Sequence, residues 1–242
     1  MFHTLILTGV LLHISDGAWI YNLNIGVTSG SPGIIPCQYK EKHKANLKYW
    51  CWGSVLSSCS VLAYGNETKT KLSITDYPEQ SIFTVEWENL QESDSGYYWC
   101  TVEITGPRKL DAGYYLYLIV QPAPDVSVMS SSVSGHEGGN LSAQCFYSSG
   151  YKAKNKQWCG YKDKKCFTEK KTDTSQNSSV QISDDGKSSF TVLMTGLRLS
   201  DSGWYFCSVG NLQFPVQLTV SKPERKVLTT TPETEIVQHV LG

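Results

Sequence analysis

The sequence predicts an all-β protein built from two similar sandwich domains in tandem. The segment Asp-Ser-Gly-Tyr-Tyr-Trp-Cys at residues 94–100 returns as Asp-Ser-Gly-Trp-Tyr-Phe-Cys at residues 201–207. Apolar and polar residues alternate around the cysteines, as in half-buried strands. The eight cysteines form two sets of four with nearly identical spacing, at positions 37, 51, 59 and 100 and at 145, 159, 166 and 207. A chain of 242 residues accommodates two such domains and two short tails.

The N-terminal residues 1–18 are predicted to be a secretory signal peptide. An apolar run at residues 5–12 is followed by the small and polar residues 15–18. Only His3 stands where a basic segment usually precedes such a run, so the alternative is a buried first strand. No later segment has the roughly 18 apolar residues of a membrane span, so we expect a membrane anchor only in a longer form.

Several functional classes are disfavoured by composition and spacing. A net charge of −1 provides no field that would gather nucleic acid. Eight cysteines in an exported chain favour disulfides over metal sites, and His43, His136 and His239 lack metal-ligand spacing. The glycine-rich residues 135–140 precede a strand where a phosphate loop needs a helix. We therefore expect a non-enzymatic protein without a cofactor.

Each domain is predicted to be a sandwich of the immunoglobulin variable type. Tyr98 and Tyr205 stand two residues before a cysteine, the position of the tyrosine corner. Trp50 and Trp158 follow the first cysteine of their domain at the same distance, and this tryptophan packs on the inter-sheet disulfide in such folds. The spacing therefore pairs Cys37 with Cys100 and Cys145 with Cys207. The chain between these cysteines is long enough for C′ and C″ strands, which favours the variable type over the constant type.

A second disulfide is expected on the outer face of each domain. Side chains alternate along a strand, so the cysteine after each inward tryptophan points outward. A neighbouring antiparallel strand brings two outward cysteines within disulfide distance. The predicted pairs, which join strands C and C′, are Cys51 with Cys59 and Cys159 with Cys166.

An ion pair between Lys71 and Asp94 is predicted across the bottom of the first sandwich. The position in domain 2 that corresponds to Lys71 is Ser178, so no such pair is expected with Asp201. A partly exposed pair of this kind contributes about 0–1 kcal/mol.

The sequence also predicts the domain boundaries, the linker, a C-terminal stalk and the sites of N-glycosylation. We expect domain 1 over 19–120, a linker over 121–125, domain 2 over 126–220 and a Thr- and Pro-bearing stalk over 221–242. The prolines of the linker leave the domains joined and only partly hinged. Asparagine sequons stand at Asn66 and Asn177 in loop-like sequence and at Asn140, which opens a strand and is expected to be less accessible.

The Lys-Tyr-Trp-Cys at 48–51, the second cysteine at 59 and the motif at 94–100 together resemble the variable-type domains of a receptor family. This family comprises the polymeric immunoglobulin receptor and the leukocyte CMRF-like receptors with a single immunoglobulin domain. The resemblance covers residues 19–220 in a two-domain form, and the extra disulfide is its most specific part. It implies an immune receptor on the extracellular side of the plasma membrane, or a secreted form, that binds polymeric immunoglobulin, another protein or an anionic lipid. A homophilic adhesion module is the competing hypothesis.

The candidate binding surface is the loop end of domain 1, where the B–C and F–G loops of a variable-type sandwich meet. The resemblance implies that the first of these loops contacts the ligand, and its basic charge would attract an acidic surface. The alternative is a solvated loop that keeps the protein soluble. Lysines of domain 2 between 151 and 171 are expected to decorate a face rather than to extend this positive end. The candidate residues are Lys40, Lys42, His43, Lys44 and Lys48 in the first loop and Arg108 and Lys109 in the second.

Overall fold

The computed structural model describes residues 23–67, 71–106, 110–168 and 179–223. The predicted signal peptide, most of the predicted stalk, the sequon at Asn177 and the candidate residues Arg108 and Lys109 lie outside these ranges. In the described part of the chain no helix is long and apolar enough to span a membrane. The sequons Asn66 and Asn140 both lie on exposed positions, so Asn140 is more accessible than expected.

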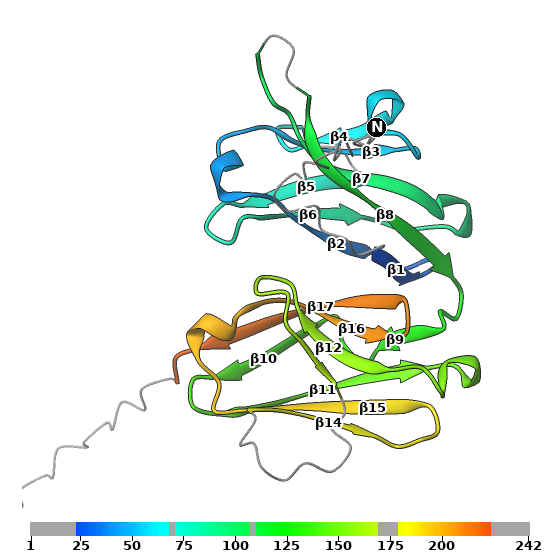
Figure 1. The fold of residues 1–242 in the computed structure, drawn as a ribbon, viewed down its shortest axis with the longest axis vertical. Coiled ribbons are helices and arrows are strands. Elements are labelled where there is room, and N and C mark those ends of the chain that lie inside the picture. The colour runs from blue at the N-terminus through cyan, green and yellow to red at the C-terminus, as the bar shows by residue number, and fades with distance from the viewer. Residues whose placement is uncertain (1–22, 68–70, 107–109, 169–178, 224–242) are drawn as a thin grey trace, which may run out of the picture.

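Domain 1 is a sandwich of two sheets (Figure 1). Its back sheet has the order β2-β6-β5 and its front sheet the order β1-β8-β7-β3-β4. The back strands are β2 (Gly33–Gln38), β6 (Ile82–Trp87) and β5 (Leu72–Tyr77). The front strands are β1 (Leu23–Thr28), β8 (Ala112–Gln121), β7 (Gly96–Val102), β3 (Lys48–Trp52) and β4 (Ser60–Tyr64).

Domain 2 repeats this architecture. Its back sheet contains β14 (Val180–Asp184), β15 (Ser189–Thr195), β11 (Asn140–Tyr147) and β9 (Val126–Val128). Its front strands are β13 (Cys166–Thr168), β12 (Lys156–Gly160), β16 (Gly203–Val209), β17 (Leu212–Ser221) and β10 (Ser132–His136). The C′ strands are β4 and β13, and the described residues contain no separate C″ strand.

Short 3₁₀ turns connect strands at corresponding places in the two domains. Domain 1 has η1 (Glu41–His43), η2 (Leu56–Ser58) and η3 (Glu92–Asp94). Domain 2 has η4 (Ser149–Tyr151) and η5 (Leu199–Asp201). The turns η1 and η4 lie in the B–C loops, and η3 and η5 lead into the F strands β7 and β16.

The core of each domain contains the disulfide, the tryptophan and the tyrosine that the repeat predicts. The structure joins Cys37 to Cys100 and Cys145 to Cys207. Trp50 and Trp158 are fully buried and stack on the tyrosines of the F strands, with ring centroids 5.0 and 5.2 Å apart. The hydroxyl of Tyr98 donates to the carbonyl of Asp94 at 2.7 Å, and that of Tyr205 donates to the carbonyl of Asp201 at 2.9 Å. These bonds are the tyrosine corners of the two sandwiches.

The outer disulfides also have the expected partners. Cys51 is bonded to Cys59, and Cys159 is bonded to Cys166, with Cα separations of 5.6 and 4.0 Å. In domain 2 the two cysteines face each other directly across β12 and β13. Each bridge therefore fixes the C–C′ hairpin of its own domain.

The predicted ion pair between Lys71 and Asp94 is wrong. Among the described ion pairs neither residue has a partner. The carboxylate of Asp94 instead accepts the backbone N–H of Gln91 at 2.8 Å and completes the turn η3. Lys71 precedes β5, where its carbonyl accepts the N–H of Glu88 at 2.8 Å. The position corresponding to Lys71 in domain 2, Ser178, lies outside the described residues.

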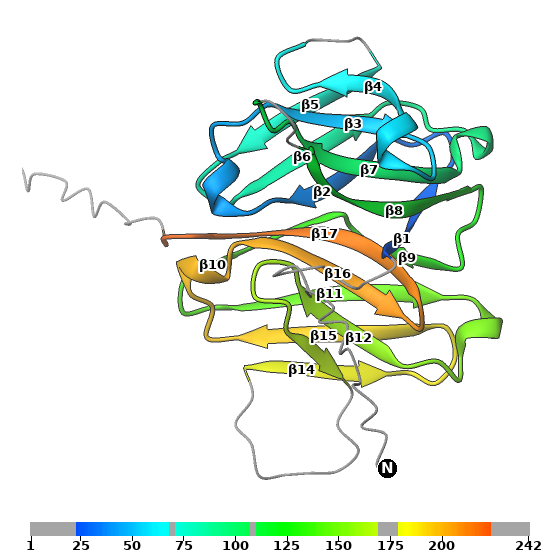
Figure 2. The same ribbon diagram turned by 45° about the horizontal axis from the view of Figure 1, so that its top comes forward.

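The two sandwiches pack side by side through a shared strand (Figure 2). Strand β1 pairs in parallel with β8 of its own domain and, through Asn24 and Ile25, with β17 of domain 2. Trp204 and Phe206 of β16 are buried in the same cluster of side chains as the core of domain 1. The domains are therefore docked more extensively than the partial hinge that the linker prolines suggest.

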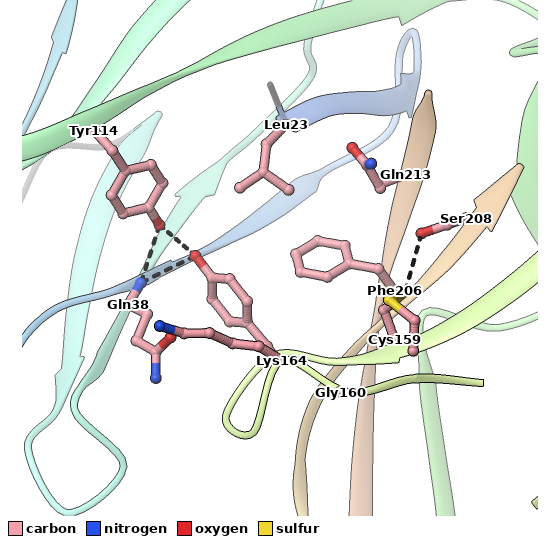
Figure 3. Close-up of a pocket in the computed structure, with 11 residues that line it drawn as sticks. Leu23, Gln38, Tyr114, Cys159, Gly160, Lys164, Phe206, Ser208 and Gln213 are labelled. Carbon is pink, nitrogen blue, oxygen red and sulfur yellow. Dashed lines mark hydrogen bonds between the residues drawn. A yellow bond between two sulfur atoms is a disulfide. The ribbon is translucent and has the colours of Figure 1, made fainter. Parts of the chain in front are cut away.

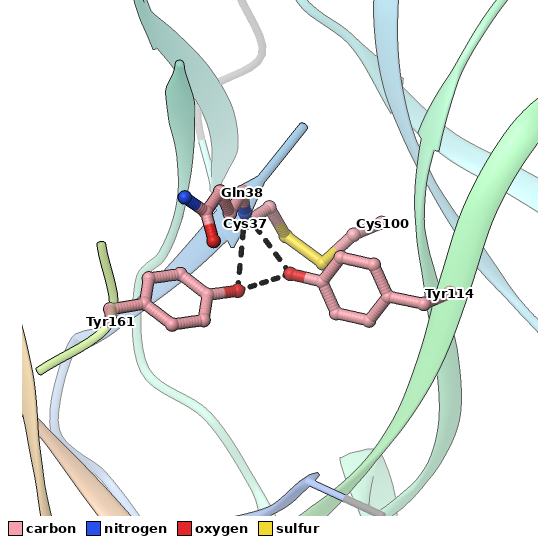
Figure 4. The surroundings of a disulfide bond; sticks show 5 residues. All are labelled: Cys37, Gln38, Cys100, Tyr114 and Tyr161. Atoms are coloured by element: carbon pink, nitrogen blue, oxygen red, sulfur yellow. Dashed lines mark hydrogen bonds between the residues drawn. A yellow bond between two sulfur atoms is a disulfide. The ribbon is translucent and has the colours of Figure 1, made fainter. Parts of the chain in front are cut away.

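A pair of tyrosines completes the contact between the domains (Figure 4). The hydroxyls of Tyr114 and Tyr161 bond to each other, and each accepts the backbone N–H of Gln38 at 3.1 Å. Burial raises the pKa of both hydroxyls, that of Tyr161 to about 12, so the pair is neutral at physiological pH. Tyr161 lies inside the loop closed by the disulfide between Cys159 and Cys166, so that bridge positions a docking residue.

Candidate functional site

The B–C loop of domain 1 is organised around Lys48, which was expected to contact a ligand. Its side chain is only 3% exposed, and its ammonium is 2.9 Å from the carboxylate of Asp76 on β5. The same ammonium donates to the carbonyls of His43 and Lys44 at 3.0 and 2.7 Å. It also lies 4.2 Å from the centroid of the Tyr39 ring. The expectation that Lys48 contacts a ligand is therefore wrong. Its buried ammonium binds Asp76 and the loop carbonyls, and a partner cannot reach it.

Domain 2 contains the same network at equivalent positions. The ammonium of Lys156 is 3.1 Å from the carboxylate of Asp184, and their side chains are 5% and 13% exposed. It also bonds to the carbonyl of Lys152 and lies over the ring of Tyr147. The hydroxyl of Tyr147 donates to Asp184 at 2.5 Å, just as that of Tyr39 donates to Asp76 at 2.8 Å. Each domain thus links its B–C loop to its back sheet through a Tyr–Asp–Lys network.

The network in domain 2 predicts acid lability. Burial alone would raise the pKa of Asp184, but hydrogen bonds from the Tyr147 hydroxyl, the Gly186 N–H and the Lys156 ammonium hold it below its ordinary value. This carboxylate therefore contributes stability that is complete above the unfolded pKa of about 3.9 and is lost as the pH falls through the folded pKa. At pH values below about 4, we therefore expect the midpoint temperature of thermal unfolding of domain 2 to decrease. Thermal unfolding of wild type and Asp184→Asn across that window tests this, and equal pH dependence in the two proteins would contradict it.

The surface of the same loop presents the remaining lysines of domain 1. Lys40 and Lys42 are exposed on either side of Glu41 at the start of the turn η1. His43 and Lys44 are half-buried, and the ammonium of Lys44 is 3.3 Å from the carboxylate of Glu41. Of the candidate residues in this loop, Lys40 and Lys42 therefore present the most accessible positive charge.

A lysine of domain 2 adds to this end of domain 1. The C–C′ turn of domain 2 directs Lys164 toward Gln38, at the end of β2 (Figure 3). Burial and the nearby charge of Lys40 lower the pKa of Lys164. Lys164 adopts a left-handed backbone conformation within this turn, with φ of 58°. Lys164 therefore lies close enough to Lys40 to extend the positive end, whereas the sequence favoured decoration of a face for the lysines of this stretch.

A small crevice lies between the domains below this lysine. It has a volume of about 80 Å³ and a mostly apolar lining that includes Leu23, Tyr114 and Phe206. The side-chain oxygen of Gln38 is buried in its wall without a hydrogen-bond partner. This volume exceeds the roughly 10–15 Å³ that one ordered water molecule requires, so the crevice has room for water beside the Gln38 oxygen.

The base of the F–G loop is fixed by Asp111. Its carboxylate accepts the N–H of Ile104 and the hydroxyl of Tyr49, each at 2.8 Å. Arg108 and Lys109, which were expected to contribute charge from this loop, lie outside the described residues. Among those residues no cluster of metal-ligating side chains is present.

Sequence reasoning missed the acidic members of the two networks. The repeat nevertheless carries a signal for them, because a Tyr follows two residues after the first core cysteine and a Lys stands two residues before the core tryptophan in both domains. The aspartates Asp76 and Asp184 end or nearly end their D strands. A triad repeated at matching positions indicates a buried network rather than a surface charge.

Comparison with known proteins agrees with this architecture. The sequence pattern described as the immunoglobulin V-set domain matches residues 22–120 and 128–224. The polymeric immunoglobulin receptor of Rattus norvegicus is 26% identical over 192 residues, which are 76% of this chain and 25% of the receptor. CMRF35-like molecule 2 of Homo sapiens is 40% identical over 81 residues, which are 31% of this chain and 40% of that protein.

A solved structure is also similar in sequence. The crystal structure of the teleost fish polymeric Ig receptor ectodomain is 36% identical, and the match covers 84% of this chain and 97% of that one with a TM-score of 0.39. The chain spans about a quarter of the length of the rat receptor.

Proposed function

The chain belongs to the immunoglobulin V-set family, and from this premise we propose that it is the ectodomain of a cell-surface immune receptor that binds polymeric immunoglobulin through the loop end of domain 1. The observation that supports the proposal most is the exposed pair Lys40 and Lys42 on a loop held from beneath by Lys48. Lys164 of domain 2 extends toward Gln38 at this end, near enough to Lys40 for the charge of that lysine to lower its pKa. We call these three exposed lysines, Lys40, Lys42 and Lys164, the basic edge.

Two physical properties make the basic edge suited to protein recognition. The network beneath the loop fixes its backbone before binding, which reduces the entropy lost on association. Its net positive charge, with Glu41 paired to Lys44, attracts an acidic protein surface and raises the association rate at low salt. Recognition by this surface requires complementary shape and charge, and the proposed role is non-enzymatic.

A second ligand class fits the same charge. Anionic lipid head groups attract lysines near a membrane surface by about 1 kcal/mol each, which would suit a leukocyte activating or inhibitory receptor. A homophilic adhesion module would instead use the loop end to bind a second copy of the chain. Both alternatives use the same residues, so they are distinguished by the ligand and not by the site.

The basic edge predicts a specific loss of binding. The variant Lys40→Ser/Lys42→Ser/Lys164→Ser should bind immobilised polymeric immunoglobulin about tenfold more weakly than wild type and with a smaller dependence on salt concentration, because it removes attraction at the rim of the interface. Surface plasmon resonance at several salt concentrations measures both quantities. The matched control Lys71→Ser/Lys187→Ser/Lys222→Ser removes the same charge from exposed positions elsewhere and should retain wild-type affinity.

Parallel assays of the same variants distinguish the alternatives. If wild type binds phosphatidylserine vesicles and not polymeric immunoglobulin, the lipid receptor replaces the proposed function. Loss of self-association in the basic-edge variant would favour adhesion through the loops. Equal binding of both triple variants to polymeric immunoglobulin would remove the basic edge from the site.

A further inference from the structure

The disulfide between Cys159 and Cys166 lies at the contact between the two domains. Both cysteines line the crevice between the domains, and the half-buried Cys159 packs against the same cluster of side chains as the core of domain 1. The bridge closes the turn at residues 160–165, which carries Tyr161 to Gln38 of domain 1 (Figure 4). A bond within domain 2 therefore holds a residue that joins the domains.

This bridge is more accessible than the other three. Of the eight cysteines, all of which the structure describes, Cys166 is the only exposed one. The cysteines of the two core bridges are at most 3% exposed, and in the outer bridge of domain 1 Cys51 is fully buried and Cys59 is half-buried. Thiol–disulfide exchange requires that an attacking thiolate reach a sulfur atom. A reductant therefore reaches the bridge between Cys159 and Cys166 most easily.

The charge of the turn favours the same reaction. Residues 160–165 include three lysines and one aspartate, whereas residues 52–58, which the outer bridge of domain 1 encloses, carry no charge. Cations attract an anionic attacking thiolate and stabilise the thiolate that is expelled. The two outer bridges therefore differ in their expected reactivity although they occupy the same place in the fold.

A buried hydroxyl identifies the sulfur that leaves. Ser208 on β16 is only 3% exposed, and its hydroxyl donates to the Sγ of Cys159 at 3.9 Å (Figure 3). A hydrogen bond of this kind becomes stronger when the acceptor is ionised. Attack at the exposed Cys166 therefore expels Cys159 as a thiolate that already has a hydrogen-bond donor.

We propose that this bridge is a redox switch, which a dithiol reductant opens in the folded protein to release the contact of Tyr161 with Gln38. One thiolate of the reductant attacks the Sγ of Cys166, and the electron pair of the broken sulfur–sulfur bond leaves on the Sγ of Cys159. The second thiolate of the reductant attacks its own sulfur in the mixed disulfide and expels the Cys166 thiolate. The two protein thiolates take up the two protons that the reductant gave to solvent. The dithiol becomes a cyclic disulfide, and the bridge gains two electrons.

Opening the bridge frees the turn from its fixed place against domain 1. Strand β13 has three residues and, among the described strands, pairs only with β12, so little else fixes the far end of the turn. The hydroxyl of Tyr161 accepts the N–H of Gln38 at 3.1 Å, and this bond depends on the position of the turn. The buried Trp204 and the pairing of β1 with β17 do not involve the bridge. We therefore expect the reduced protein to lose the tyrosine contact while the domains stay together.

The switch also regulates the ligand site, and this consequence rests on the proposed function. Lys164 belongs to the basic edge and lies in the turn that the bridge closes. A freed turn no longer holds Lys164 near Lys40, so the reduced protein keeps only the two lysines of the first loop in place. In oxidising surroundings the basic edge is complete, and where dithiols accumulate its attraction for an acidic partner is weaker.

Limited reduction of the full chain with dithiothreitol, followed by alkylation and mass spectrometry of the peptides, tests the selectivity of opening. We expect Cys159 and Cys166 to be labelled at least about tenfold faster than Cys51 and Cys59, because access and charge both favour their bridge. The core cysteines should stay unlabelled, which shows that the protein remains folded. Equal labelling of the two outer bridges, or faster labelling of Cys51 and Cys59, would overturn the proposal.

Hydrogen exchange at the Gln38 amide measures the contact itself, because this N–H donates to the hydroxyls of Tyr114 and Tyr161. After selective opening of the bridge in wild type we expect this amide to exchange about fivefold faster. The variants Cys159→Ser/Cys166→Ser and Tyr161→Phe, the second of which keeps the bridge, should show the same increase. The matched control Cys51→Ser/Cys59→Ser opens the equivalent bridge of domain 1 and should leave exchange at Gln38 unchanged.

Unchanged exchange at Gln38 in wild type with an open bridge would overturn the switch even where opening is selective. Unchanged exchange in Tyr161→Phe, or an equal increase in the control, would also overturn it. The wild-type measurements need no substitution, so they test the proposal if a serine variant does not fold. No ligand is present in these experiments, so failure of the switch leaves the proposed function to its own binding assay.

Discussion

Replacement of Lys156 by Met is expected to lower the free energy of unfolding of domain 2 by about 3–5 kcal/mol. The change leaves the carboxylate of Asp184, only 13% exposed, without its cationic partner. It also removes the donor to the carbonyl of Lys152, which holds the B–C loop. Urea denaturation followed by tryptophan fluorescence measures the change.

Two further variants separate the ion pair from nonspecific effects. Lys152→Met alters an exposed side chain in the same loop and should change the free energy of unfolding by less than about 0.5 kcal/mol. The double variant Lys156→Met/Asp184→Leu removes both charges and should recover much of the loss, because a buried pair replaced by apolar side chains leaves no unpaired charge. Equal destabilisation by Lys152→Met and Lys156→Met would contradict the assigned role.

Replacement of Trp204 and Phe206 by Ser is expected to undock the two domains while each remains folded. Truncation of one buried aromatic side chain costs about 3–5 kcal/mol. Here the loss falls on docking, because both side chains lie on the outer face of domain 2 and pack against domain 1. We expect a larger radius of gyration in small-angle scattering and two separate transitions in calorimetry.

The equivalent residues of domain 1 supply the control for undocking. The variant Tyr97→Ser/Tyr115→Ser removes aromatic side chains from the corresponding face without touching the domain contact, so its scattering at low concentration should match that of a docked monomer. An unchanged radius of gyration in Trp204→Ser/Phe206→Ser would show that strand β1 and the hydroxyls of Tyr114 and Tyr161 suffice for docking.

The core of the fold could be predicted from sequence because its signals are local and repeated. A cysteine, a tryptophan and a tyrosine at fixed spacing define the core disulfide and the tyrosine corner, and alternation on the C strand indicates an outward cysteine such as Cys51. The structure contains these features at both positions of the repeat. Strand alternation and short-range spacing were therefore enough to place them.

The buried lysines could not be identified in the same way. Lys48 stands among four other basic residues of a polar loop, and its partner Asp76 lies on a strand of the opposite sheet. Whether such a lysine is buried depends on the distance between the two sheets, which local sequence does not specify. The same limit applies to Trp204 and Tyr97, which occupy equivalent positions but differ in burial because a domain packs on one of them.

Domain docking likewise depends on contacts distant in sequence. Strand β1 pairs with β17 across almost the whole described chain, and Tyr161 reaches Gln38 from the C–C′ turn of the other domain. The linker prolines indicated limited slack but carried no information about which faces meet. The nearness of Lys164 to Lys40 could not be predicted for this reason, since it follows from docking of the two domains.

Hydrogen exchange of the chain with and without polymeric immunoglobulin tests the central claim most directly, because it maps the contact without a mutation. The proposed function predicts that backbone amides of residues 40–47 and of the turn at 162–165 gain protection in the complex. Protection confined to other surfaces, or no change at the loop end of domain 1 at saturating ligand, would contradict the assignment of that end as the binding site.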